Sequence, residues 1–227
     1  MSGSSELPEG GGVSPTVLDA MAAGYTVLSR LLLGSPSQET LEQTRRPDML
    51  ADWPVALSDN TARGIVHLAR SREANEDATA VKRDYNRLFV GPDKLLAPPY
   101  ESVHRSREGL VFEAETMQVR AFYARFGLAA PRLDREPDDH IGLEFELMAT
   151  LCLRALDALE DDDDDRAAQL TAAQAEFLRE HLLAWAPDLM QLIQDHADTE
   201  FYRGVGALGA DLLEFSAVEL GMATRAT

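Results

Sequence analysis

Apolar residues recur at helical spacing along most of this chain, and no window of strand length alternates apolar with polar residues. Ala78, Val81, Tyr85 and Leu88, for example, stand three or four positions apart. Such spacing places apolar side chains on one face of a helix, whereas a half-buried strand needs strict alternation. The sequence has no internal repeat, and its 227 residues suffice for one core. It therefore predicts an all-α fold, a single multi-helix domain.

Capping residues and helix breakers give the expected helix ends. Ser14 and Pro15 are an N-cap and a first-turn proline, so a helix is expected from there to Gly34. Further helices are expected at 38–52 with an interruption near Pro47, from Ser58, from Ala78 to Gly91, and at 113–126, 138–159, 167–185, 187–197 and 200–222. Residues 1–13 are rich in Gly, Ser and Glu and are expected to be disordered, which leaves 14–227 as the helical domain. Helix 138–159 is apolar on nearly every side and is expected at the centre of the domain.

The charge balance is strongly acidic, with 39 Asp and Glu against 21 Lys and Arg and a formal charge of -18. A phosphate backbone would be repelled by such a surface, so nucleic acid is excluded as a partner. Lys82 and Lys94 are the only lysines, and an acidic run extends from Glu160 to Asp165. An acidic, lysine-poor surface suits a high-salt cytoplasm, where ions screen the repulsion. We predict a halophilic source; an ordinary acidic protein is the alternative.

Two further features indicate a cytoplasmic protein. Cys152 is the single cysteine and cannot form an internal disulfide, so nothing points to an oxidising compartment. The apolar stretch Val17 to Leu33 is interrupted by Asp19 and Arg30, and it lacks the basic segment and cleavage site of a signal peptide. No stable membrane insertion is expected.

Two stretches carry more chemistry than a helical scaffold needs, namely 85–103 and 136–148. Residues 95–106 carry apolar groups without a helical period, and adjacent Pro98 and Pro99 hold the backbone extended there, since proline cannot occupy a helix interior. In the second, Asp138 and Asp139 are expected at a helix N-terminus, where carboxylates are favoured.

His140 and Glu144 stand four positions apart on one face of the same helix. The two side chains can pair with each other, bind a metal, act as an acid/base couple, or simply cap and brace the helix. The sequence has no metal-ligand motif, nucleophile elbow or phosphate-binding loop. We therefore expect no metal, no cofactor and no enzymatic activity.

The order of three separated motifs resembles that of a known family, the TorD/DmsD family of redox-enzyme maturation chaperones. The matching positions are Tyr85, Leu88-Phe89, Gly91-Pro92, the run from Pro98 to Val103, the run from Glu136 to His140, the run from Leu143 to Met148, Phe177-Leu178, His181, Trp185, Pro187 and Phe201-Tyr202. The resemblance spans about residues 15–222.

This resemblance implies an all-helical cytoplasmic chaperone for molybdopterin enzymes of the dimethyl sulfoxide reductase type. Such proteins bind the twin-arginine signal peptide of a precursor and hold it back from export until its cofactor is inserted. Carried over by motif, the peptide-binding positions are Tyr85, Leu88, Phe89, Pro99, Tyr100, Asp139 and His140. Family members include domain-swapped dimers, so both monomer and homodimer stay open.

The chemistry of the ligand points to the same two stretches. A twin-arginine peptide offers two guanidinium groups followed by an apolar run, so a receptor needs carboxylates beside an apolar groove. The carboxylates are supplied by Glu101, Asp138, Asp139 and Glu144. The predicted site also includes Pro98 and Ser102, which lie in the same stretch as Pro99 and Tyr100. Two alternatives remain: an accessory protein that binds a nucleotide or molybdopterin, and a general all-α module that binds another basic amphipathic segment.

Overall fold

The computed structural model describes residues 12–55, 58–91, 95–106, 114–128 and 137–222, and these ranges form helices with no strand. The predicted all-α fold is thereby confirmed. The elements in chain order are α1 (Pro15–Leu33), α2 (Gln38–Thr44), α3 (Pro47–Ala51), α4 (Asp59–Glu73), α5 (Ala78–Tyr85), the π-helical turn η1 (Asn86–Val90), α6 (Glu101–Arg105), α7 (Ala114–Arg125), α8 (Ile141–Glu160), α9 (Asp164–Phe177), the π-helical turn η2 (Leu178–Leu182), α10 (Leu183–His196) and α11 (Glu200–Glu219).

Several helix ends follow from their local sequence. The Ser14 hydroxyl accepts the amide N–H of Val17 at 3.3 Å and caps α1. Ser58 caps α4 and exchanges hydrogen bonds with Thr61 as a capping box. Gly127 follows α7 with φ of 63°, a left-handed conformation that glycine adopts without strain. These ends agree with the predicted ones. Most of the expected disordered segment, residues 1–11, lies outside the described residues.

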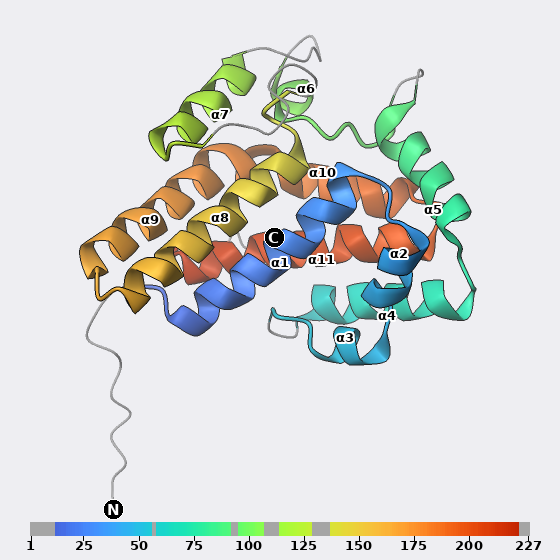
Figure 1. Ribbon diagram of the computed structural model, residues 1–227. Helices are drawn as coiled ribbons and strands as arrows, with labels where there is room; N and C mark the ends of the chain where they lie inside the picture. The colour runs from blue at the N-terminus through green and yellow to red at the C-terminus, as the bar shows by residue number, and fades with distance from the viewer. Residues whose placement is uncertain (1–11, 56–57, 92–94, 107–113, 129–136, 223–227) are drawn as a thin grey trace, which may run out of the picture.

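The core forms where α1, α8 and α11 cross the middle of the molecule (Figure 1). Tyr25 of α1 is fully buried there, with its ring 5.2 Å from that of Phe145 on α8. Its hydroxyl donates to Ser216 of α11 at 2.9 Å, which satisfies the buried polar group. Helices α9 and α10 cover further faces of this core, and α4 packs on α11 below it (Figure 1).

Helix α1 is, within the described ranges, the one helix long and apolar enough to cross a membrane by length and hydropathy. Half of that segment is buried inside the protein. Leu18, Met21 and Leu28 are among its core residues. Its apolar character is therefore accounted for by its packing against α8 and α11.

The beginning of α8 differs from the prediction. The helix begins at Ile141 and not at Asp138, because His140 is the N-cap. Its Nδ1 atom accepts the amide N–H of Gly142 at 3.0 Å. Asp138 and Asp139 precede the helix and bond to other elements. We expected this helix to begin at Asp138, with one of the two aspartates as its cap, and that boundary was wrong.

Two other predicted boundaries were also wrong. A break was expected at Pro187, but α10 continues through it from Leu183 to His196. The π-helical turn η2 directly precedes α10, and both prolines and π turns are places where helices bend without ending. The stretch after Pro99 was expected to lack helical structure, yet Glu101–Arg105 forms the short helix α6.

Candidate functional site

The two stretches singled out in the sequence meet in space. The carbonyl of Pro99 accepts the amide N–H of Ile141 at 2.9 Å, and the amide of Glu101 donates to the carbonyl of Asp139 at 3.0 Å. Tyr100 and His140 form an isolated antiparallel bridge between these bonds. The extended loop therefore lies along the residues that precede α8. We call the surface formed by residues 95–105 and 137–144 the loop–helix junction.

Asp139 ties three segments together at this junction. Its side chain is fully buried and accepts the amide N–H of Ser102 at 2.8 Å through Oδ2. Its Oδ1 accepts the hydroxyl of Thr116 on α7, also at 2.8 Å. The neighbouring carboxylate of Asp138 is 1% exposed and accepts Nε of Arg120 on α7. The two aspartates thus fix the positions of α6 and α7 against the beginning of α8.

Glu101 connects the junction to the C-terminal half of the chain. It is fully buried, and its Oε2 lies 2.8 Å from Nδ1 of His181 on η2. The His181 ring stacks on Phe177 with centroids 4.8 Å apart. The other oxygen of Glu101 accepts a hydrogen bond from Arg105, one turn along α6. A single carboxylate thereby contacts partners from two elements.

Glu144 is a second fully buried glutamate beside Glu101. Burial raises its pKa well above the ordinary value of 4.5, and the nearby carboxylates of Glu101 and Asp139 raise it further. Trp185 donates its indole N–H to Oε2 of Glu144 at 3.3 Å. Oε1 has no hydrogen-bond partner in the described part of the chain. Burial and the neighbouring carboxylates therefore both favour the neutral, protonated form of Glu144.

His140 is 3% exposed, and burial lowers its pKa from 6.5 to about 4 although Asp139 acts in the opposite direction. The imidazole is therefore neutral near pH 7, with Nδ1 accepting from Gly142 as the cap of α8. Its ring lies edge-on to Tyr100, with centroids 5.2 Å apart. The Glu144 amide donates to the His140 carbonyl at 3.0 Å as part of the helix, but the side-chain bonds of the two residues go to Gly142 and Trp185, so the suggested side-chain pair is not formed.

The aromatic and aliphatic candidates divide into core and surface groups. Tyr85, Leu88 and Phe89 are buried, and the Tyr85 hydroxyl donates to the carbonyl of Leu32 at 3.3 Å. Pro99 and Ser102 are buried as well, whereas Pro98 and Tyr100 are half-buried. Among the described residues of this stretch, the apolar side chains that reach solvent are Val90, Leu95, Leu96, Pro98, Tyr100 and Val103.

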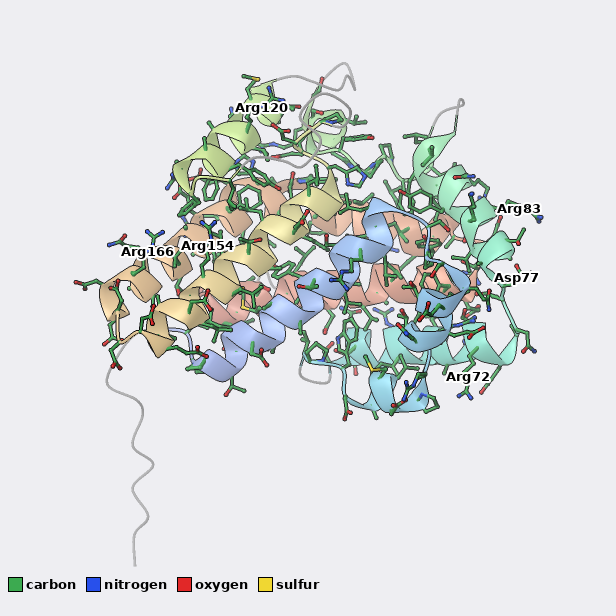
Figure 2. The ribbon with its side chains drawn as sticks, viewed as in Figure 1. Arg72, Asp77, Arg83, Arg120, Arg154 and Arg166 are labelled. Carbon is green, nitrogen blue, oxygen red and sulfur yellow. The ribbon has the colours of Figure 1, made fainter. Side chains whose placement is uncertain are left out.

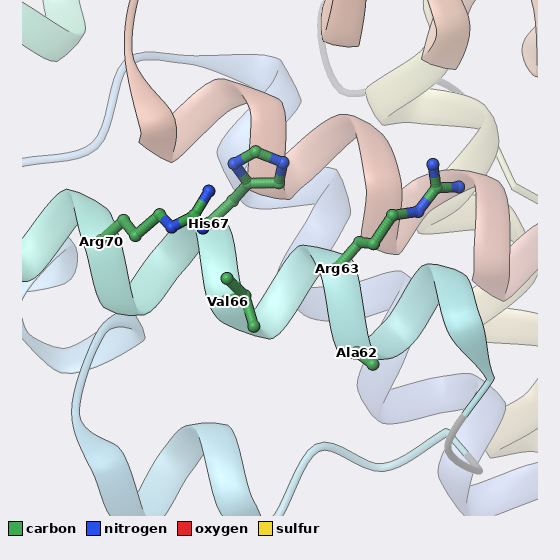
Figure 3. Close-up of a pocket in the computed structure, with 5 residues that line it drawn as sticks. All are labelled: Ala62, Arg63, Val66, His67 and Arg70. Atoms are coloured by element: carbon green, nitrogen blue, oxygen red, sulfur yellow. The ribbon is translucent and has the colours of Figure 1, made fainter.

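A shallow depression of about 350 Å³ lies elsewhere, along α4. It is lined by Ala62, Arg63, Val66, His67 and Arg70 (Figure 3). In Figure 1, α4 lies on the side of the molecule opposite α6. None of the predicted site residues lines it, and its arginines would repel a cationic peptide.

Comparisons with known proteins identify the family. Residues 55–191 match the family described as nitrate reductase delta subunit. The chain belongs to this family. It is 27% identical to the probable Tat proofreading chaperone DmsD of Haemophilus influenzae over 176 residues, and this aligned segment covers 78% of this chain and 77% of the relative. It is 29% identical over 194 residues to DmsD of Salmonella typhi, covering 84% and 85%, and 27% identical over 191 residues to the chaperone protein TorD of Aliivibrio fischeri, covering 81% and 86%.

The match to this family confirms the resemblance to the TorD/DmsD chaperones seen in the sequence. Relatives from several organisms are named as chaperones, and this protein is a chaperone of the same family and not an enzyme. Within the described ranges, no group of three or more His, Cys, Asp or Glu side chains is arranged to hold a metal ion.

Several residues of the site were not among the predicted ones. His181 and Trp185 belong to the C-terminal pattern of the family resemblance, but their spacing gives no sign that they reach Glu101 and Glu144. Arg105 and Thr116 carry no sequence signal at all beyond their residue types. Only the packing of η2, α10 and α7 around the junction brings these side chains to the carboxyl groups.

Proposed function

We propose that this protein is a cytoplasmic chaperone that binds the twin-arginine signal peptide of a molybdopterin oxidoreductase precursor of the dimethyl sulfoxide reductase type. It holds the precursor during cofactor insertion and maturation and releases it for export. The names of the relatives, Tat proofreading chaperone DmsD and chaperone protein TorD, support this function.

The observation that carries the proposal is the composition of the loop–helix junction. An extended apolar loop lies directly beside the carboxyl groups of Glu101, Asp138 and Asp139. A twin-arginine peptide presents guanidinium groups followed by an apolar run, and the junction offers a matching group for each part. In dilute salt the formal charge of -18 adds a long-range attraction for a cationic peptide, and in high salt this attraction is screened and the apolar contacts carry more of the affinity.

The exposure of the residues in and beside the junction separates those proposed to contact the peptide from those that support the surface. Leu95, Leu96, Pro98 and Tyr100 reach solvent, as does Val90 before the junction, and these side chains are proposed to contact the apolar run of the peptide. The other candidates are buried and support this surface from beneath. Asp139 and His140 hold the loop against α8, and the carboxylates of Glu101 and Asp138 are the partners proposed for the guanidinium groups.

Calorimetry with three synthetic peptides tests the proposal. We expect a twin-arginine peptide with its apolar run to bind more tightly than a twin-lysine version, because lysine keeps the charge but loses the bidentate fork. A twin-arginine peptide with a polar run should also bind less well, because it loses apolar burial. Equal binding of all three peptides would overturn the signal-peptide proposal.

A matched pair of surface variants tests the location. Tyr100→Ser should weaken binding of the twin-arginine peptide, whereas Val66→Ser should not, because Val66 is exposed on α4 away from the junction. Equal effects of the two substitutions would place the peptide elsewhere. The client is identified by purifying the protein from native extract, where a molybdopterin oxidoreductase subunit with an intact signal peptide is the expected companion.

A further inference from the structure

Two arginines of the chain itself cover buried carboxylates at the loop–helix junction. Arg105 bonds to Glu101 and also donates to the carbonyl of Glu180 at 3.0 Å. Arg120, on α7 (Figure 2), donates through Nε to Asp138. The carboxylate side chains are 0% and 1% exposed, whereas those of Arg105 and Arg120 are 33% and 38% exposed. Each arginine therefore lies between a buried carboxylate and solvent.

The Asp138 carboxylate retains capacity for a further donor. Its Oδ1 atom is buried and has no hydrogen-bond partner among the described residues, and the same holds for the hydroxyl of Ser102 on α6. A buried carboxylate oxygen without a donor is unusual, because most buried polar atoms in native proteins are satisfied. A guanidinium that approached as a two-pronged fork would occupy both oxygens of this carboxylate.

We propose that Arg105 and Arg120 are internal substitutes for the guanidinium groups of the ligand, and that the two arginines of an incoming peptide exchange with them at Glu101 and Asp138. This inference rests on the proposed function and adds its regulation. The two carboxylates belong to adjoining segments, since the amide of Glu101 bonds to the carbonyl of Asp139 at 3.0 Å. Two guanidinium groups from neighbouring arginines of a peptide therefore match these two carboxylates in number and in charge.

Such an exchange makes the resting protein self-inhibited. Without the internal arginines, Asp138 would lose its partner from α7 and Glu101 would keep only His181 among the described residues, and leaving buried carboxylates short of partners is costly. Only molecules in which the internal arginines are displaced can bind the peptide. The apparent affinity is therefore the intrinsic affinity multiplied by the fraction of such molecules, and it is lower when that fraction is small. Weaker binding of this kind favours release of the precursor after maturation.

The test uses the full chain and the same twin-arginine peptide in calorimetry at one salt concentration. Arg105→Gln and Arg120→Gln each remove one internal competitor, so each should bind the peptide about fivefold more tightly than the unmodified protein. The peptide should also raise the melting temperature of these variants more than that of the unmodified protein. Arg125→Gln is the matched control, because Arg125 lies on α7 and pairs with Glu176 outside the junction.

The outcomes separate this inference from the proposed function. Peptide binding by the unmodified protein, with equal or weaker binding by both glutamine variants, would overturn the exchange and leave the signal-peptide function standing. No binding by any of the proteins would overturn both. If the glutamine variants melt below the assay temperature, Arg105→Lys and Arg120→Lys serve instead, since they keep the charge but form a weaker internal partner. They too must bind the peptide more tightly for the inference to hold.

Discussion

Replacing Glu144 with glutamine tests whether this buried side chain is a neutral acid in the folded protein. Glutamine has nearly the same shape, keeps an oxygen for the indole N–H of Trp185, and has an N–H donor where a protonated acid has its O–H. At a pH at which Glu144 is protonated in both the folded and the unfolded protein, Glu144→Gln and the unmodified protein should therefore differ by less than about 1 kcal/mol in unfolding free energy.

The pH dependence carries the larger effect. The folded-state pKa of Glu144 lies well above its ordinary value of 4.5, so between these two values the unfolded chain loses a proton that the folded chain keeps. Stability of the unmodified protein then falls as pH rises, by up to about 1.4 kcal/mol per pH unit from this group alone. Glutamine has no proton to lose, so the variant gains on the unmodified protein as pH rises.

Urea unfolding from about pH 5 to about pH 8 measures this difference. Glu146→Gln is the control, because Glu146 is exposed on the same helix and its replacement should change stability by less than about 0.5 kcal/mol at every pH. Parallel stability curves for Glu144→Gln and the unmodified protein would refute the reasoning. So would a loss of about 3 kcal/mol or more near neutral pH, which is typical of breaking a buried ion pair.

Four further predictions follow from the fold. The pKa of His140 is lowered from 6.5 to about 4, so the unfolded chain binds a proton between these pH values that the folded chain does not. In urea unfolding, the unmodified protein should therefore lose about 3 kcal/mol relative to His140→Asn, which keeps a capping oxygen, as the pH falls from 6.5 to about 4. Asp139→Asn loses one of two buried hydrogen bonds and should lower stability by about 1 to 3 kcal/mol; unchanged stability with weakened peptide binding would instead make Asp139 a direct contact. Gly204→Ala should cost about 1 to 3 kcal/mol in urea unfolding, because its Cβ would lie 3.0 Å from the Gly64 carbonyl oxygen, whereas Gly34→Ala meets nothing. If the acidic composition is a halophilic adaptation, the melting temperature should rise from dilute to molar KCl, and a flat or falling curve would contradict it.

The sequence by itself determined the helical class and many of the helix ends. Apolar spacing and capping are local properties, so Ser14, Ser58 and Gly127 mark the ends of α1, α4 and α7 without any knowledge of the rest of the chain. The sequence also identified the two stretches that meet at the loop–helix junction. It did so through motif order and residue chemistry, and not through any signal of their contact.

Only the tertiary structure decided which partners the polar residues of these stretches take. His181 bonds to Glu101 across 80 positions of sequence, and Trp185 bonds to Glu144 across 41. The start of α8 at Ile141 follows from the tertiary bonds that engage Asp138 and Asp139. The raised pKa of Glu144 likewise depends on burial and on the carboxylates of Glu101 and Asp139 that packing brings near it. Such contacts depend on how helices pack, and the residue pattern of one helix does not specify which side chains of other helices lie against it.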